Sequence, residues 1–559
     1  MTTPTGGVAP APSRAAAAPL ERKKGKTSAK KKTTDGSGSS KPKKKVAVRR
    51  PGAVSTEAPA SSLVEPAADA HHVFDEMPPR MTIQNSSSLD ESNPKKMVVI
   101  YTLSGMPGHL FPTVELGKLL VAQGLEVTVI FGGEDDDDSH GAGGSFLADP
   151  SPLVHSLPRV TLPSDVRAGS DQDKILGREC ASIPNLREFL RSTTPALAAL
   201  VIDSFCSGAL DVGAELGIPT YFFLTTCTAC LAFSLHKPAI DEQHQIALSF
   251  RDLAGVFVRA PGVPPIPVDH LPAFLLDRGS LSSRFFLELP ERLCNSQGLI
   301  VNSCRYLEPR ATDAIVSGLC TYRGRQTPPL YCIGPLIRPE EAGTKRHECL
   351  AWLDGQPKAS VVFVSFRSLG RFSAEQIKQM AAGLETSGQR FLWVVRRPTT
   401  GDEHQPADDL DALFPEGFLY RTKERGLVVM SWAPQREVLA HGAVGGFVTH
   451  CGWNSVLEAV MAGVPMLAWP LYAEQRMNKV FLVEEMQLAV AMEGYVKEMV
   501  EAREVAAKVR WLVDSDGGWE LRQRTLAAMR QAKEALDDGG ESRTALLHLV
   551  RECKNAGDS

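Results

Sequence analysis

Two short segments contain a histidine and a carboxylate that could act together in proton transfer. His109 lies in SGMPGH, and Asp203 ends the apolar run LAALVID. A neutral imidazole can take a proton from a hydroxyl group, and a carboxylate on its other nitrogen fixes the tautomer and stabilises the imidazolium. Small residues around His109 would let a ligand approach closely. The pair therefore predicts a general base with an orienting partner.

The second segment, VGGFVTHCGWNS, combines polar side chains with a small-residue turn. His450 ends its apolar run, and Asn454 and Ser455 are expected to open a helix, because both are strong N-caps. Free amides and the dipole of a helix start attract anions. These three side chains therefore predict a phosphate site, with Glu458 one turn further along, within reach of a ribose diol.

Two further apolar runs are followed by side chains that suit a base and sugar hydroxyls. Trp432 and Pro434 follow GLVVM and offer a flat face for a base, while Glu474 and Gln475 follow PMLAWPLYA and suit sugar hydroxyls. The segment 432–475 thus contains most of the residues that we expect to contact a base, a phosphate and a sugar.

The elements that must position these residues alternate between strand-length apolar runs and amphipathic helical stretches. The predicted strands cover 97–103, 125–132, 197–203, 220–226, 360–366, 390–396, 426–432, 444–450 and 465–470. Such alternation implies parallel sheets covered on both faces. We predict an α/β fold with two facing, doubly wound Rossmann-like domains joined near residue 340. Ligands bind outside the carboxyl ends of such strands, which favours an interdomain cleft.

The first part of the chain has a different composition. Residues 1–94 are rich in Ala, Pro, Ser, Thr, Gly and Lys and nearly free of aromatics. Such a segment buries too little apolar area to offset the entropy of ordering, so we expect a disordered basic tail. Its lysine clusters leave nuclear targeting open, and its start, low in acidic residues, leaves plastid targeting open. Otherwise the absence of a secretion signal favours the cytoplasm.

Composition excludes several classes of protein. The net charge of −4 gives no overall attraction to nucleic acid, and no stretch of 18 apolar residues predicts a membrane span. The 11 cysteines form no paired framework; Cys227 and Cys230 have redox-motif spacing, but we expect buried thiols. The acidic run EDDDDSH (134–140) reads as a solvated loop rather than a cation site.

The segment 432–475 resembles the signature box of the plant UDP-dependent glycosyltransferases, the inverting family 1 enzymes of GT-B type. Trp, Pro-Gln, His-Cys-Gly-Trp-Asn-Ser, Glu, Gly-Val-Pro, Trp-Pro and Glu-Gln all fall in register, and weaker resemblance extends from about 95 to 553. The resemblance implies an acceptor-binding domain at 95–338, a UDP-sugar-binding domain at 345–540, and a helix at about 541–555 that returns to the first domain.

The resemblance also implies a role for each matching residue. Trp432 would stack on uracil, Gln435 and Glu458 would hold the ribose, and Glu474 and Gln475 would contact the sugar. The full donor set is Ser368, Trp432, Ala433, Gln435, His450, Trp453, Asn454, Ser455, Glu458, Glu474 and Gln475. Of these, His450, Asn454 and Ser455 would bind the diphosphate and Trp453 the sugar, with His109 and Asp203 as the catalytic pair.

The implied reaction transfers glucose from UDP-glucose to a hydroxyl of a small phenolic acceptor such as a flavonoid, giving a β-glucoside. The closing Gln475 is similar to that of glucose-using members. The implied enzyme needs no metal and no cofactor beyond the donor, and we expect a monomer. An NAD-dependent oxidoreductase is disfavoured, because no Gly-x-Gly-x-x-Gly opens either first helix.

Two departures from the family pattern leave a second interpretation open. Arg367 stands where the family has glycine, and Pro107 is expected to lengthen or stiffen the loop that carries His109 and so to displace the base. Arg367 would either block the donor phosphates or pair with them. The alternative is therefore a catalytically impaired nucleotide-sugar binding or scaffold protein of the same fold.

Overall fold

The computed structural model describes most of the chain beyond residue 95. The described residues are 96–132, 154–193, 197–244, 250–253, 255–276, 279–338, 346–367, 370–398, 413–496 and 499–556. The predicted tail (1–94), the acidic run 134–140 and the predicted phosphate ligand Ser368 lie outside them. The chain divides into the units 1–88 and 89–559, and the fold below is that of the second unit.

The first sheet of the described chain has seven parallel strands in the order β3-β2-β1-β4-β5-β8-β9. The strands are β1 (Met97–Thr102), β2 (Glu126–Phe131), β3 (Val154–Ser156), β4 (Leu197–Asp203), β5 (Thr220–Leu224), β8 (Gly298–Val301) and β9 (Leu330–Cys332). The order reverses between β1 and β4, which makes this pair the switch point at which such sheets bind ligands.

Helices and short elements connect these strands. They are α1 (Pro107–Ala122), α2 (Ser164–Arg167), α3 (Asp171–Thr193), η1 (Ser204–Cys206), α4 (Ala209–Leu216), α5 (Thr228–Gln243), η2 (Phe250–Leu253), η3 (Val268–His270), α6 (Ala273–Leu276), α7 (Leu281–Cys294) and α8 (Pro309–Val316). The strands β6 (Phe257–Val258) and β7 (Ile266–Pro267) form a small antiparallel pair.

The start of α1 corrects one prediction. His109 was expected in a loop, but α1 begins at Pro107 and His109 lies in its first turn. Proline suits this first position, since its missing N–H needs no partner there and its φ angle is already helical. Pro107 therefore starts the helix that carries His109 instead of lengthening the loop.

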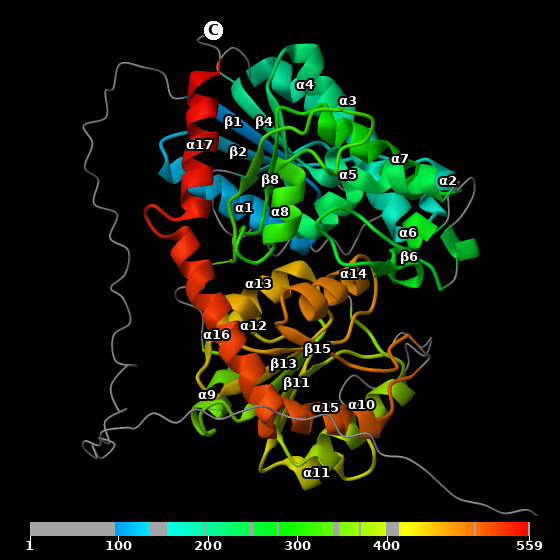
Figure 1. Ribbon diagram of the computed structural model, residues 1–559, viewed down its shortest axis with the longest axis vertical. Coiled ribbons are helices and arrows are strands. Elements are labelled where there is room, and N and C mark those ends of the chain that lie inside the picture. The colour runs from blue at the N-terminus through cyan, green and yellow to red at the C-terminus, as the bar shows by residue number, and fades with distance from the viewer. Residues whose placement is uncertain are drawn as a thin grey trace, which may run out of the picture. The chain divides into compact units, whose positions relative to one another are not determined.

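The second sheet has six parallel strands in the order β12-β11-β10-β13-β14-β15 within the described residues. The strands are β10 (Val361–Ser365), β11 (Arg390–Val395), β12 (Gly426–Met430), β13 (Val444–Thr449), β14 (Met466–Ala468) and β15 (Ala489–Ala491). Here the order reverses between β10 and β13. The predicted α/β fold with two doubly wound sheets is confirmed (Figure 1).

The helices of this part follow the same alternation. They are α9 (Glu348–Asp354), α10 (Ala374–Ser387), α11 (Phe418–Thr422), α12 (Gln435–Ala440), α13 (Trp453–Ala462), α14 (Gln475–Val480), η5 (Phe481–Glu485), α15 (Ala502–Asp514), α16 (Asp516–Leu536) and α17 (Glu541–Asn555). No helix in the described ranges is long and apolar enough to cross a bilayer.

The start of α13 corrects a second prediction. Gly452 is the N-cap, so Asn454 and Ser455 belong to the first helical turn and do not cap it. Glycine is needed at this position because a Cβ on Gly452 would lie 2.5 Å from His450 Nε2. The imidazole thus packs against the backbone at the helix start.

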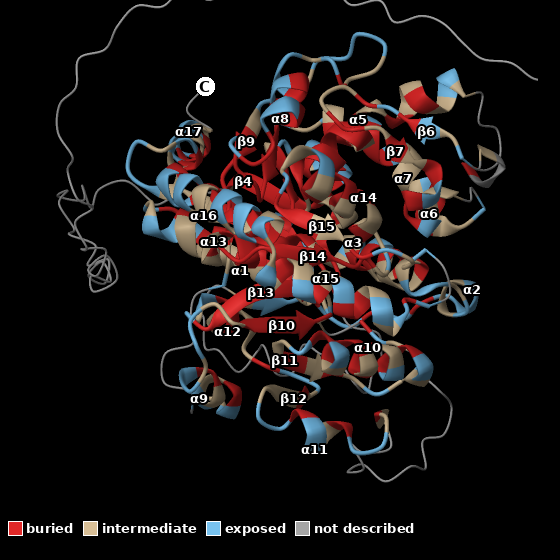
Figure 2. Cartoon of the chain, turned by 60° about the horizontal axis from the view of Figure 1, so that its bottom comes forward, coloured by how far each residue is buried: buried red, intermediate tan, exposed pale blue. Residues whose placement is uncertain are grey.

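The strands of both sheets are largely buried, as expected for parallel sheets (Figure 2). The last helix, α17, places Leu546, Leu549 and Val550 in a cluster with Val98 and Ile100 of β1. It contacts β9 and β4 and so packs on the first sheet (Figure 1). The last helix of the described chain therefore belongs to the packing of the first sheet.

Candidate functional site

The predicted base and its partner meet at the switch point of the first sheet. His109 follows β1 and Asp203 ends β4, and His109 Nδ1 lies 2.8 Å from Asp203 Oδ2. The other carboxylate oxygen of Asp203 accepts a hydrogen bond from Phe205 N at 2.9 Å, which fixes its orientation. The Nδ1 proton directed at Asp203 leaves Nε2 as the nitrogen that can accept a proton.

The surroundings of His109 change its pKa. Burial alone lowers the pKa, but the charge and hydrogen bond of Asp203, with a smaller contribution from the charge of Glu474, raise it above its ordinary value. Asp203 comes from the same sheet, whereas Glu474 comes from the second sheet's half of the protein. One carboxylate from each half of the protein therefore raises the pKa of the imidazole.

Two further side chains at this point were not predicted. Thr225 Oγ1 lies 3.1 Å from His109 Nδ1, and Phe205 contacts the imidazole edge-on with ring centroids 5.0 Å apart. Thr225 could have been found, because it directly follows the strand next to β4 and so reaches the same sheet edge. Phe205 follows Asp203 by two residues, so its position after β4 also indicates that it lies at this sheet edge.

The predicted phosphate residues gather at the switch point of the second sheet. His450 directly follows β13, and Asn454 and Ser455 lie in the first turn of α13. Two of their buried polar atoms, His450 Nδ1 and Asn454 Oδ1, have no hydrogen-bond partner among the described residues. Burial, and secondarily the charge of Arg367, lowers the pKa of His450 to about 3, so its imidazole is neutral.

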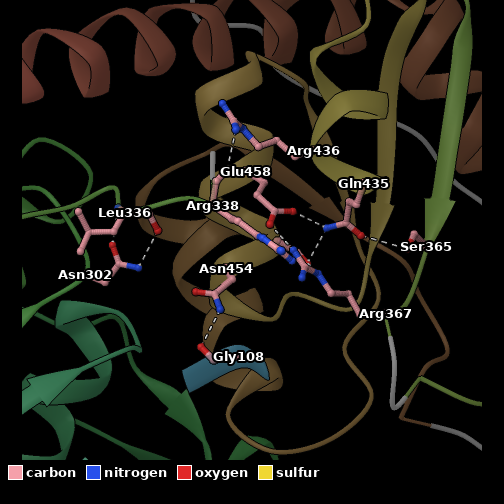
Figure 3. Close-up of polar contacts among 11 residues, drawn as sticks. Gly108, Asn302, Leu336, Arg338, Ser365, Arg367, Gln435, Arg436, Asn454 and Glu458 are labelled. Carbon is pink, nitrogen blue, oxygen red and sulfur yellow. Dashed lines mark hydrogen bonds and ion pairs between the residues drawn. The ribbon is translucent and has the colours of Figure 1, made fainter. Parts of the chain in front are cut away.

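The predicted ribose residues form one hydrogen-bonded group with Ser455 (Figure 3). Gln435 Nε2 donates to Glu458 Oε2 at 2.7 Å and to Ser455 Oγ at 3.0 Å. Ser365, at the end of β10, donates its hydroxyl to Gln435 Oε1 at 3.1 Å. Ser365 was not predicted, although ligand-binding residues are expected at the end of a central strand such as β10. The group holds the Glu458 carboxylate at the helix start.

Arg367 joins this group from the turn after β10. Its Nε donates to Ser455 Oγ at 3.0 Å, and its guanidinium forms an ion pair with Glu458 (Figure 3). The residue that departs from the family pattern thus lies among the predicted ribose and phosphate ligands.

The aromatic and small residues of the predicted set lie in two different environments. Trp432 is 62% exposed, with its ring edge near His347, whereas Ala433 beside it is buried. Trp453 is only 3% exposed, and its indole N–H donates to Asn302 O at 2.7 Å. This bond joins Trp453 to the other half of the protein, and its sugar contact stays a prediction.

Glu474 and Gln475 lie at the start of α14. Gln475 Oε1 accepts from the backbone N–H groups of Leu471 and Tyr472 at 2.9 and 3.1 Å. A contact with a sugar would therefore use the amide nitrogen of Gln475. The charge of Glu474 also contributes to the raised pKa of His109.

Of the other candidate sites, the cysteine pair lies in the described chain and the acidic run does not. Cys227 and Cys230 are buried free thiols at the start of α5, as expected. Within the described ranges, no three His, Cys, Asp or Glu side chains come together as metal ligands.

Comparison with known proteins points to one family. The family described as "UDP-glucoronosyl and UDP-glucosyl transferase" matches residues 338–515. Anthocyanidin 5,3-O-glucosyltransferase of a Rosa hybrid cultivar is 40% identical over 473 residues, 81% of this chain and 98% of that protein. Phloretin 2'-O-glucosyltransferase of Malus domestica is 40% identical over 482 residues, with coverages of 81% and 99%.

A solved structure matches as well. Phytolacca americana UGT2, complexed with UDP-2fluoro-glucose and pterostilbene, has a TM-score of 0.73 and 34% identity, covering 82% of this chain and 99% of that one. The two switch points, the signature segment and relatives matched over nearly their whole length lead to one assignment. The chain belongs to family 1 of the plant UDP-dependent glycosyltransferases.

Proposed function

We propose that this glycosyltransferase moves glucose from UDP-glucose to a hydroxyl of a small phenolic acceptor. The observation that carries the proposal is the 2.8 Å contact between His109 Nδ1 and Asp203 at a switch point, with the charge of Glu474 reaching the same imidazole. The contact supports His109 as the proton acceptor, and the charge of Glu474 supports a donor sugar on the same side of the imidazole.

The reaction then follows from the side chains present. His109 Nε2 takes the proton of the acceptor hydroxyl, and Asp203 stabilises the imidazolium. The acceptor oxygen attacks the anomeric carbon from the face opposite UDP, a C–O bond forms, and the bond to the UDP oxygen breaks with its electron pair. The α-linked donor sugar becomes a β-glucoside.

The donor residues have the roles that their positions support. Glu458 and Gln435 would hold the ribose, and Trp432 would present its exposed face to the uracil beside Ala433. His450 Nδ1, the Ser455 hydroxyl and the free backbone N–H of Asn454 in the first turn of α13 would donate to the diphosphate. Glu474 and the Gln475 amide would contact the sugar hydroxyls.

A cluster of aromatic rings beside the base supports a phenolic acceptor. Phe205 contacts His109 and also Phe285 and Phe286, and Phe286 stacks on Phe274 with centroids 4.1 Å apart. These four rings, the phenylalanine cluster, are only partly buried. Aromatic side chains favour planar aromatic partners through stacked and edge contacts. The names of the rose and apple relatives likewise specify an anthocyanidin and phloretin as acceptors.

The test is transfer to a panel of flavonoids and simple phenols, with product detected by mass. UDP-glucose, UDP-galactose and UDP-glucuronate would be compared, with and without added Mg²⁺ and chelator. We expect a β-glucoside from UDP-glucose, unaffected by the chelator, and no product from His109→Ala. UDP binding without transfer from any donor would instead support the non-catalytic binding protein.

A further inference from the structure

Arg367 occupies a backbone position that favours glycine. It follows β10 by two residues and has φ of +54°, in the left-handed region that non-glycine residues rarely adopt. The backbone conformation therefore disfavours an arginine at this position. Its side chain must explain its presence.

That side chain occupies the polar groups assigned to the nucleotide (Figure 3). The guanidinium pairs with Glu458 and donates to Ser455 Oγ at 3.0 Å, and both partners are largely buried. Glu458 also accepts from Gln435. Ribose hydroxyls can reach the Glu458 carboxylate fully only if the guanidinium leaves it.

The neighbouring phosphate residues lack a charge of their own. His450 is neutral, and its Nδ1 and the Oδ1 of Asn454 are buried without partners in the described structure. A diphosphate at the helix start would thus meet dipoles and amides from α13. The cation whose charge acts on His450 is Arg367.

We propose that Arg367 serves the donor site in two positions. In the empty enzyme its guanidinium holds Glu458 and Ser455; when UDP-glucose binds, the ribose takes Glu458 and the guanidinium turns to the diphosphate. A planar guanidinium can donate two parallel hydrogen bonds to phosphate oxygens. It would then also stabilise the negative charge that UDP gains as the glycosidic bond breaks. This inference rests on the proposed function of the same site.

Nucleosides and nucleotides separate this role from simple obstruction. Uridine must displace Arg367 from Glu458 without offering a phosphate, whereas UDP offers both groups. We would titrate uridine, UMP and UDP calorimetrically into the full chain and into Arg367→Gly, Arg367→Lys and Arg367→Gln. Glycine accepts the left-handed backbone, so Arg367→Gly is expected to fold, and the melting temperature of each variant would verify this.

For Arg367→Gly we expect uridine to bind a few-fold more tightly and UDP about tenfold more weakly, or about 1.4 kcal/mol. Arg367→Lys keeps the positive charge but cannot donate two parallel hydrogen bonds, so its UDP affinity should lie between those of the wild type and Arg367→Gly. Arg503→Gln removes an exposed arginine, 84% accessible, on α15 and is the matched control; its ratio of uridine to UDP affinity should equal that of the wild type.

Other results would overturn the inference. If Arg367→Gly binds uridine and UDP more tightly by the same factor, Arg367 only obstructs the site. An unchanged ratio of the two affinities shows that the guanidinium never meets the phosphates. If the wild type binds no UDP at all, the proposed function itself fails, which is a distinct outcome.

Discussion

Asn454 Nδ2 donates a hydrogen bond of 2.7 Å to the backbone carbonyl of Gly108, the residue directly before His109 (Figure 3). The contact joins the first turn of α13 to the first turn of α1. It therefore links a residue assigned to the diphosphate with the turn that carries the base. In this arrangement, donor binding and base position depend on the same pair of helix starts.

Replacing His109 with alanine tests the division of labour between the two halves. The variant should lose about 10²–10⁴-fold in kcat, because no base remains to take the acceptor proton. UDP affinity, measured calorimetrically, should stay within about twofold, since the substitution leaves the donor-binding residues unchanged. A large loss of UDP affinity would contradict the assignment of His109 as base.

The pH dependence of kcat/KM reports the pKa of that base in the free enzyme. His109 must be neutral to accept a proton, and its pKa is raised, so activity should rise with pH through a midpoint above about 6.5. In Asp203→Asn the raising carboxylate is gone and burial remains, so the midpoint should move to lower pH while the maximum rate falls. An acid limb that stays in place would show that another group titrates there.

Gly452 sets the position of the His450 imidazole. In Gly452→Ala the new Cβ would meet His450 Nε2 at 2.5 Å, so the ring or the helix start must move. We expect about a tenfold loss in UDP affinity. Gly442→Ala is the matched control, because nothing lies within 4 Å of its Cβ. Equal UDP affinity in the two variants would mean that His450 does not contact the diphosphate.

The phenylalanine cluster should act on the acceptor alone. Phe286→Leu removes a ring that contacts Phe205 and Phe274 but not His109, so the KM for a flavonoid acceptor should rise about three- to tenfold, while UDP affinity stays unchanged. Phe257→Leu, at a residue 53% exposed, should leave both values unchanged. A rise in the KM for UDP-glucose instead would place the cluster at the donor.

Much of this site could be predicted because it lies at strand ends. Apolar runs identified β1, β4, β10 and β13, and the residues after the parallel strands of one sheet gather at the same edge of that sheet. The helix starts were misplaced by a few residues. Pro107 carried the signal for α1, whereas the need for Gly452 depends on a contact with His450 that only the folded chain shows.

Contacts between distant segments could not be predicted. Nothing in the sequence pairs Asn454 with Gly108, or the side chain of Arg367 with Glu458, because these partners depend on how separate strands and helices meet. Trp453 shows the same limit. Its place in the signature segment implied a sugar contact, which stays a prediction, but gave no sign of its bond to Asn302 in the other half of the protein.

The last prediction concerns that tryptophan. Trp453 Nε1 donates to Asn302 O, and the Asn302 amide in turn binds the backbone of Leu336 through bonds of 2.7 and 3.1 Å. In Trp453→Phe the ring still fills its place, but the buried Asn302 carbonyl loses its donor. Such a loss costs about 1–3 kcal/mol, so the melting temperature should fall by a few degrees.

The matched control is Trp519→Phe, at a residue 63% exposed, which should melt at the wild-type temperature. If the indole instead contacts the sugar, Trp453→Phe would raise the KM for UDP-glucose without lowering the melting temperature. A lower melting temperature with unchanged KM assigns Trp453 to the joint between the two halves. Together the two measurements separate stabilisation of the fold from recognition of the donor.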